Sequence, residues 1–119
     1  MHWQFKEQHP LEERKIEAVS MISRYPDRIP VVVQCAPHGQ INDIDKHKFL
    51  VPFELTIAQF IWYIRKRAKI SANKSIFLFI RGKELPQAGS LMGEIYRDCK
   101  DEDGFLYIQY SGENTFGTE

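Results

Sequence analysis

The sequence predicts an α+β domain in which helices pack on one mixed sheet. Its 119 residues are the size of a single domain. Apolar runs rich in β-branched residues alternate with stretches of helical periodicity, which indicates strands and helices in one chain. No internal repeat, low-complexity stretch or linker divides the sequence. With a hydrophobic fraction of 43%, the chain has enough apolar residues for one core.

The first helix is expected before Pro26. In "LEERKIEAVSMISRYP", Ile16, Val19 and Ile22 fall on one helical stripe, which predicts the buried face. Pro26 should end the helix, because the residue before a proline is pushed out of the α region. Residues 1–26 are therefore expected to form an N-terminal helical extension packed on the core.

Two strands should follow this extension. "RIPVVVQCA" is a β-branched run typical of a buried strand. The polar stretch "PHGQINDID" connects it to "HKFLVP", a second strand that ends at Pro52. The pair predicts a hairpin.

"TIAQFIWYIRKRAKI" is the clearest helix of the chain. Thr56 and Gln59 have the spacing of a capping box. The cations of "RKRAK" fall in the last turns, where they suit the helix dipole. The apolar positions that repeat at helical spacing are Ile57, Phe60, Ile61, Ile64 and Ala68.

The remaining elements complete a known order. "SIFLFI" predicts a third strand buried on both faces, "RGKELP" a turn, "SLMGEIYRDCK" a short helix with Ser90 as N-cap, and "GFLYIQY" the last strand. This order is that of the ubiquitin-like β-grasp, with a four-stranded mixed sheet and an added N-terminal helical segment. We assign residues 27–111 to this domain and 112–119 to a flexible C-terminal tail. Such a fold alone leaves the function open.

Composition narrows the classes of function. Lys+Arg and Asp+Glu balance at 16 each, so charge does not argue for a nucleic-acid partner. No apolar run approaches the roughly 20 residues that span a bilayer, and the opening lacks the apolar core of a secretory signal. The two cysteines form no disulfide framework, and the histidines lack metal-ligand spacing. A reduced, cytoplasmic protein without a metal site is expected.

Catalysis by this chain is not expected. The sequence contains no GxSxG, P-loop or GxGxxG motif. A thiol nucleophile at Cys35, assisted by His38 or His47, is a conceivable alternative. A lone cysteine in an apolar strand, however, is usually a small buried hydrophobe.

The segment "DKHKFLVP" carries the strongest functional signal. Successive side chains of a strand point to opposite faces, so Phe49 and Val51 should share one face while Lys48, Leu50 and Pro52 share the other. If this strand lies at the sheet edge, its backbone can pair with an extended peptide. Alternate side chains would then form pockets, and the lysines would attract acidic flanks.

Five segments together resemble one family. "YPDRIPVVVQ", "DKHKFLVP", "LTIAQFIWYIRKR", "DEDGFLYIQY" and "SGENTFG" are similar to the ubiquitin-like autophagy modifiers, the family of autophagy-related protein eight, the GABA-receptor-associated protein and microtubule-associated protein light chain three. The resemblance runs from about Trp3 to Gly117. It implies a modifier of the ubiquitin-like conjugation pathway rather than an enzyme.

The resemblance also implies how such a modifier works. A cysteine protease would recognise Phe116 and remove Thr118 and Glu119, which exposes Gly117. Activating and conjugating enzymes would then transfer Gly117 to phosphatidylethanolamine, the only non-protein group implied. The protein would be a cytoplasmic monomer before this step and would sit on phagophore and autophagosomal membranes after it.

Finally, the resemblance implies a groove for cargo receptors and adaptors that carry an aromatic-x-x-aliphatic motif. The pocket for the aromatic residue would consist of Glu17, Met21, Pro30, Lys48, Leu50 and Phe105. The pocket for the aliphatic residue would consist of Phe49, Val51, Pro52, Leu55, Phe60 and Ile64. The charged rim would consist of Arg28, Lys46 and Arg67. The surface for the processing enzymes would include Phe77 and Phe79. The alternative left open is a β-grasp interaction domain that is never conjugated.

Overall fold

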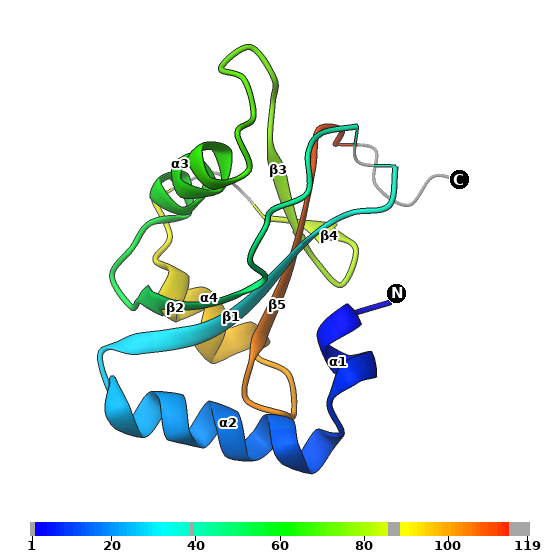
Figure 1. The fold of residues 1–119 in the computed structure, drawn as a ribbon. Coiled ribbons are helices and arrows are strands. Elements are labelled where there is room, and N and C mark those ends of the chain that lie inside the picture. Colours follow the sequence, from blue (N-terminus) through cyan, green and yellow to red (C-terminus); the bar gives the residue numbers. More distant parts are fainter. Residues whose placement is uncertain (1, 39, 86–88, 115–119) are drawn as a thin grey trace.

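The computed structural model describes residues 2–38, 40–85 and 89–114, and it has the predicted α+β architecture (Figure 1). The elements in chain order are α1 (Gln4–Gln8), α2 (Leu11–Arg24), β1 (Arg28–Cys35), β2 (Lys48–Pro52), α3 (Ile57–Arg67), β3 (Phe77–Ile80), β4 (Lys83–Glu84), α4 (Met92–Cys99) and β5 (Leu106–Ser111).

The strands form one mixed sheet in the order β2-β1-β5-β3-β4. β1 and β2 form the predicted antiparallel hairpin, β1 runs parallel to β5, and β3 is antiparallel to both of its neighbours. The ubiquitin-like β-grasp is thereby confirmed. The expected number of four strands was too low, because the "RGKELP" turn adds the two-residue strand β4. Arg81 and Gly82 both have positive φ, 51° and 80°, as tight hairpin turns favour.

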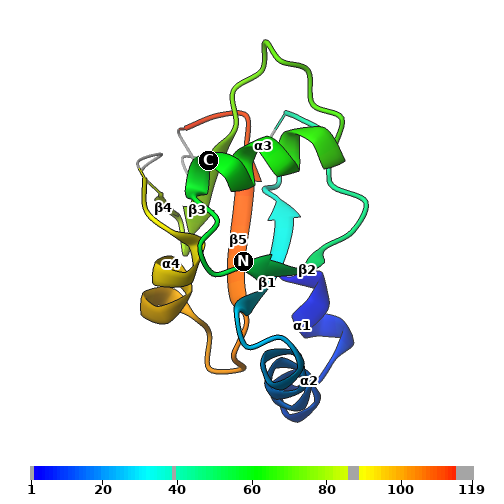
Figure 2. The same ribbon diagram turned by 90° about the vertical axis from the view of Figure 1, so that its left-hand side faces the viewer.

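Alternate residues of the central strands supply two apolar layers. Val31 and Val33 of β1 belong to the larger core, which α3 and α4 cover, whereas Val32 belongs to a smaller cluster on the opposite face. Trp3 and Met21 of the extension pack against this smaller cluster. Figure 2 shows α3 crossing the sheet, and Figure 1 shows α2 along its lower end. The helical extension therefore covers the face that α3 leaves open.

The extension differs from the prediction in two respects. It forms two helices, because His9 and Pro10 are both extended between α1 and α2. The predicted stripe was also wrong: Ile16 and Val19 are 69% and 65% exposed. Arg14 and Ala18 are the buried positions of α2 instead. The predicted stripe considered only apolar residues as candidates for the buried face. In the structure the ion-paired Arg14 occupies a buried position of the helix instead.

Arg14 is buried because Asp103 neutralises it. Arg14 Nε donates to Asp103 Oδ2 at 2.8 Å, and one terminal nitrogen donates to the carbonyl of His9 at 2.6 Å. The Tyr107 hydroxyl and the Phe105 amide also donate to the Asp103 carboxylate, at 2.5 and 2.9 Å. Burial raises the pKa of Tyr107, and its bond to Asp103 raises that pKa further. This Arg14–Asp103–Tyr107 cluster fastens the extension to the sheet.

Local sequence defines the starts of the two helices on the other face. The predicted capping box is confirmed: Gln59 N–H donates to Thr56 Oγ1 at 3.1 Å, and Thr56 N–H donates to Gln59 Oε1 at 2.9 Å. Ser90, however, is not the N-cap of α4. Leu91 holds that position, and its N–H donates to the Glu94 side chain. The Ser90 carbonyl instead accepts from Ile57 N–H at 3.1 Å, which ties the starts of α3 and α4 together.

No helix in the described part of the chain has the length and apolar character that crossing a membrane requires.

Candidate functional site

Strand β2 lies at one edge of the sheet, with β1 as its partner among the described strands. Its side chains alternate as predicted. Phe49 and Val51 are 6% and 4% exposed and belong to the core, while Lys48 and Leu50 are half-buried and Pro52 is exposed. An edge strand with one anchored face and one accessible face can accept an extended peptide as a further strand.

A largely apolar cavity of about 420 Å³ lies between β2 and α3. We call it the α3 cavity. Tyr63 packs edge-on against Phe49, with ring centroids 5.6 Å apart. Ile64 is fully buried in the core and does not line the cavity. The other five residues predicted for the aliphatic pocket all line it. The full lining is Phe49, Leu50, Val51, Pro52, Leu55, Gln59, Phe60, Trp62 and Tyr63.

Three of these lining residues, Gln59, Trp62 and Tyr63, were not predicted from the sequence. Trp62 is 61% exposed at the cavity edge. A signal was available, because Trp62 falls outside the apolar stripe of α3 and a large aromatic side chain left outside a core face indicates a contact surface. Tyr63 carried a weaker signal, since it adjoins the stripe.

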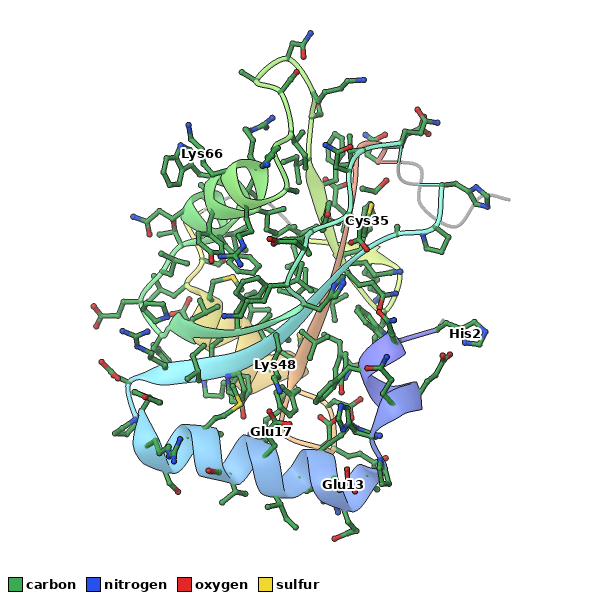
Figure 3. The ribbon with its side chains drawn as sticks, viewed as in Figure 1. His2, Glu13, Glu17, Cys35, Lys48 and Lys66 are labelled. Atoms are coloured by element: carbon green, nitrogen blue, oxygen red, sulfur yellow. The ribbon has the colours of Figure 1, made fainter. Side chains whose placement is uncertain are left out.

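The residues predicted for the aromatic pocket meet where α2 approaches β2. Lys48 and Glu17 form an ion pair between these two elements, and Figure 3 shows their side chains pointing toward one another. Lys48 Nζ also lies 5.4 Å from the Phe5 ring centroid. Met21 is partly buried and packs against the smaller cluster, which includes the fully buried Phe105. The Lys48–Glu17 pair thus links β2 to α2, and Met21 of the same helix is partly accessible.

Pro30 and Leu50 complete this set from the two strands. Pro30 on β1 is buried and is the register partner of Leu50 on β2. Leu50 also lines the α3 cavity. Leu50 thus stands between the two predicted pockets, about where a short extended motif would pass from one to the other.

The three cations predicted for the rim differ in whether they already pair with a carboxylate of this chain. Lys46 and Arg28 are exposed and, among the described residues, form no ion pair; Lys46 Nζ lies 5.5 Å from the Phe49 ring centroid. Arg67 is paired with the chain's own Asp45, with Nε 2.9 Å from Oδ1. The hydrogen bond from Arg67 lowers the pKa of Asp45. Lys46 and Arg28 are the cations most open to an acidic partner.

The residues predicted for the processing enzymes lie elsewhere. Phe77 and Phe79 are on β3, across the sheet from β2. Phe77 is half-buried and lines a cavity of about 350 Å³ beside α3, whereas Phe79 is 2% exposed. The predicted tail residues Phe116, Gly117, Thr118 and Glu119 lie outside the described residues.

The geometry disfavours the alternative of a thiol nucleophile. Burial, with a smaller contribution from Asp43, raises the pKa of Cys35 to about 11. Its Sγ donates to the carbonyl of Ile41 at 3.6 Å. His47 directs Nδ1 at the carbonyl of Val33, 2.8 Å away, and Nε2 toward Asp43. Cys35 therefore remains a protonated thiol near neutral pH, and His47 is engaged with other groups.

Comparison with known proteins identifies the family. A family model described as autophagy protein Atg8, ubiquitin-like, matches residues 13–117. The chain belongs to the Atg8 family. It is therefore a ubiquitin-like autophagy protein, as the sequence motifs predicted.

Plant relatives show the same full-length similarity to the Atg8 family. Autophagy-related protein 8d of Arabidopsis thaliana is 52% identical over 113 residues, which cover 95% of this chain and 93% of that protein. Autophagy-related protein 8e of the same plant is 55% identical over 113 residues, covering 95% and 92%.

Two solved Atg8 structures share the fold. The crystal structure of Trypanosoma brucei ATG8 matches with a TM-score of 0.90 at 39% identity, covering 98% of this chain and 100% of that one. Plasmodium falciparum Atg8, solved in complex with a Plasmodium falciparum Atg3 peptide, matches with a TM-score of 0.83 at 34% identity, covering 94% and 98%.

Proposed function

We propose that this Atg8-family chain is a conjugated modifier and peptide-binding scaffold, not an enzyme. Processing exposes Gly117, and Gly117 is joined to phosphatidylethanolamine on phagophore and autophagosomal membranes. The lipidated protein then recruits receptors and adaptors through an aromatic-x-x-aliphatic motif. Before conjugation the protein is a cytoplasmic monomer.

The observation that carries the binding part of this proposal is the edge strand β2 beside the α3 cavity. An extended motif adds its backbone to β2, its aliphatic side chain enters the α3 cavity, and its aromatic side chain packs at Met21. Lys46 and Arg28 attract acidic residues around the motif and mainly raise the association rate. Main-chain pairing supplies affinity, and the two pockets supply specificity.

The conjugation part rests on family membership and on the tail sequence. Glycine suits a bond that enzymes must cut and rejoin, because without a Cβ its backbone enters narrow channels and adopts conformations closed to other residues. The lipid contributes two acyl chains at about 0.8 kcal/mol per buried methylene, so it anchors firmly where a single chain is marginal. A processing cysteine protease and the activating and conjugating enzymes are the partners required. Support for a conjugating enzyme as a partner comes from the Plasmodium falciparum Atg8 complex, whose ligand is an Atg3 peptide.

The tail variants test conjugation. Gly117→Ala should abolish tail removal and membrane attachment, whereas a chain truncated after Gly117 should bypass the protease and still be lipidated. A chain ending at Phe116 should not be lipidated. These variants are expressed in cells lacking the native protein, and intact mass and membrane fractionation are measured. Normal lipidation of the forms without Gly117 would support the alternative, a β-grasp interaction domain that is never conjugated.

A peptide titration tests the groove. Leu50→Ala should weaken binding of an aromatic-x-x-aliphatic peptide by about 1–3 kcal/mol, as the loss of a central packed contact does. Ile16→Ala is the matched control, because Ile16 is an apolar residue exposed on the outer face of α2. Calorimetry measures the affinity, and thermal melting verifies folding. Unchanged affinity in a folded Leu50→Ala protein would exclude this binding site.

A further inference from the structure

A second cavity, of about 440 Å³, lies on the face of the sheet opposite α3, and no residue of β2 lines it. We call it the α1 cavity. Its walls come from α1, the β3–β4 turn, the end of α4 and the middle of β5. Residues that line it and carry the argument are Trp3, Lys6, Arg81, Asp101, Tyr107 and Gln109. The groove described above uses none of these six.

Gln109 is the unexplained residue of this cavity. It is 3% exposed, and its Nε2 has no hydrogen-bond partner among the described residues. Its register partner on β1, Gln34, shows the usual arrangement: Nε2 donates to the carbonyl of His2 at 2.9 Å, and Oε1 accepts from Gln4 N–H at 3.2 Å. Buried polar groups in folded proteins are nearly always paired, so an unpaired amide donor that lines a cavity points to a ligand.

The charged side chains around Gln109 indicate whether that ligand is a cation or an anion. Lys6 Nζ lies 2.8 Å from Asp101 Oδ1, so this pair is neutral overall. Arg81 is exposed, and its guanidinium donates to the carbonyl of Cys99 at 3.1 Å; it forms no ion pair with any carboxylate in the described part of the chain. The cavity therefore has two cations, one carboxylate and an unused amide donor. This combination favours an anion with oxygen acceptors.

The apolar side of the cavity indicates what carries the anion. Trp3 and Tyr107 meet edge-to-face, with ring centroids 5.0 Å apart. Ring walls of this kind bind an apolar group, whereas a free inorganic anion would gain nothing from them. Guanidinium and amide donors match the planar, two-oxygen acceptor of a carboxylate.

We propose that the α1 cavity binds a carboxylate on an apolar stem. Gln109 Nε2 and Arg81 donate to the carboxylate oxygens, and the stem packs on Trp3 and Tyr107. A free organic acid and the terminal carboxylate of a peptide offer this same chemistry. The site is independent of the β2 groove and of lipid conjugation.

The test is a titration of ¹⁵N-labelled protein with two acidic probes, 4-phenylbutyrate and the peptide Gly-Gly-Gly-Ser-Phe. NMR follows the side-chain amide of Gln109 and the indole N–H of Trp3. Saturable shifts of both signals are expected, with millimolar or tighter dissociation constants, and 4-phenylbutanamide and the C-terminally amidated peptide should produce none. Saturation by the free acid alone assigns the site to small acids, and saturation by the peptide extends it to chain termini. Equal binding of the neutral and acidic probes, or no saturation by either acid, would overturn the proposal.

Substitution separates binding from folding. Gln109→Met keeps the side-chain length but removes the donor, so the affinity for the acidic probe that saturates the site should fall at least tenfold. Its melting temperature should match or exceed that of the wild type, because an unpaired buried amide is gone. Gln59→Met, which changes a glutamine of the α3 cavity, and Leu50→Ala should both retain full carboxylate binding. Wild-type affinity in Gln109→Met would contradict the assignment.

Discussion

Replacing Asp103 should detach the N-terminal extension from the sheet. Asp103 is 1% exposed and Arg14 is 8% exposed, so Asp103→Ala leaves a guanidinium buried without its counter-charge. Breaking a buried ion pair from one side costs about 3–5 kcal/mol. The Tyr107 hydroxyl and the Phe105 amide lose the same acceptor, and these losses overlap with the first because all belong to one network. We expect a total of about 3–5 kcal/mol.

The assay is urea unfolding combined with amide hydrogen exchange of α2. Glu13→Gln is the matched control: Glu13 lies on the same helix, in an exposed pair with His9 at 3.6 Å, and its loss should cost under about 1 kcal/mol. The double variant Arg14→Met/Asp103→Leu should recover much of the stability, since apolar residues of similar size often replace a buried pair without loss. If Asp103→Ala is no less stable than Glu13→Gln, the cluster does not hold the extension.

Four further outcomes follow from particular contacts. The thiol of Cys35, with its pKa raised to about 11, should react slowly with iodoacetamide at pH 8 and faster as pH rises toward 11; fast alkylation of the folded protein at pH 8 would contradict this. Burial raises the pKa of Asp101, but the hydrogen bond and charge of Lys6, the Asp103 backbone N–H and the charge of Arg14 together lower it overall. Its stabilising contribution should thus be complete above the unfolded pKa near 3.9 and disappear as pH falls through the lower folded value, and Lys6→Met should flatten this part of the pH–stability curve. Gly93→Ala should destabilise by about 1–3 kcal/mol in thermal melts, because a Cβ at Gly93 would overlap the ring of Phe53, which packs against the core, and an unchanged melting temperature would refute that packing. Trp62→Ala should weaken motif-peptide binding without lowering the melting temperature, since Trp62 is mostly exposed; equal affinity by calorimetry would remove it from the groove.

The elements of this fold were predictable where local chemistry decides them. A β-branched run predicted β1, a continuous apolar run predicted β3, and the Thr56–Gln59 pair predicted the start of α3, because backbone preference and capping act within a few residues. The alternation in "KFLVP" likewise predicted which β2 side chains share a face. The Atg8 family was recognisable for the same reason, since its motifs are contiguous segments.

The tertiary structure alone decided the features that join distant segments. The sequence did not place Arg14 inside, because its burial depends on Asp103, 89 residues away. It did not place Tyr63 in the α3 cavity, and it did not show that Gln109 Nε2 has no hydrogen-bond partner among the described residues, because both depend on how α3 and α1 pack on the sheet. By itself, the sequence determined the elements, the family and most groove residues, since these are written in short patterns. Packing between elements decides which charged groups are buried and where cavities remain. Short sequence patterns do not predict these features, because the segments that pack together are distant in the sequence.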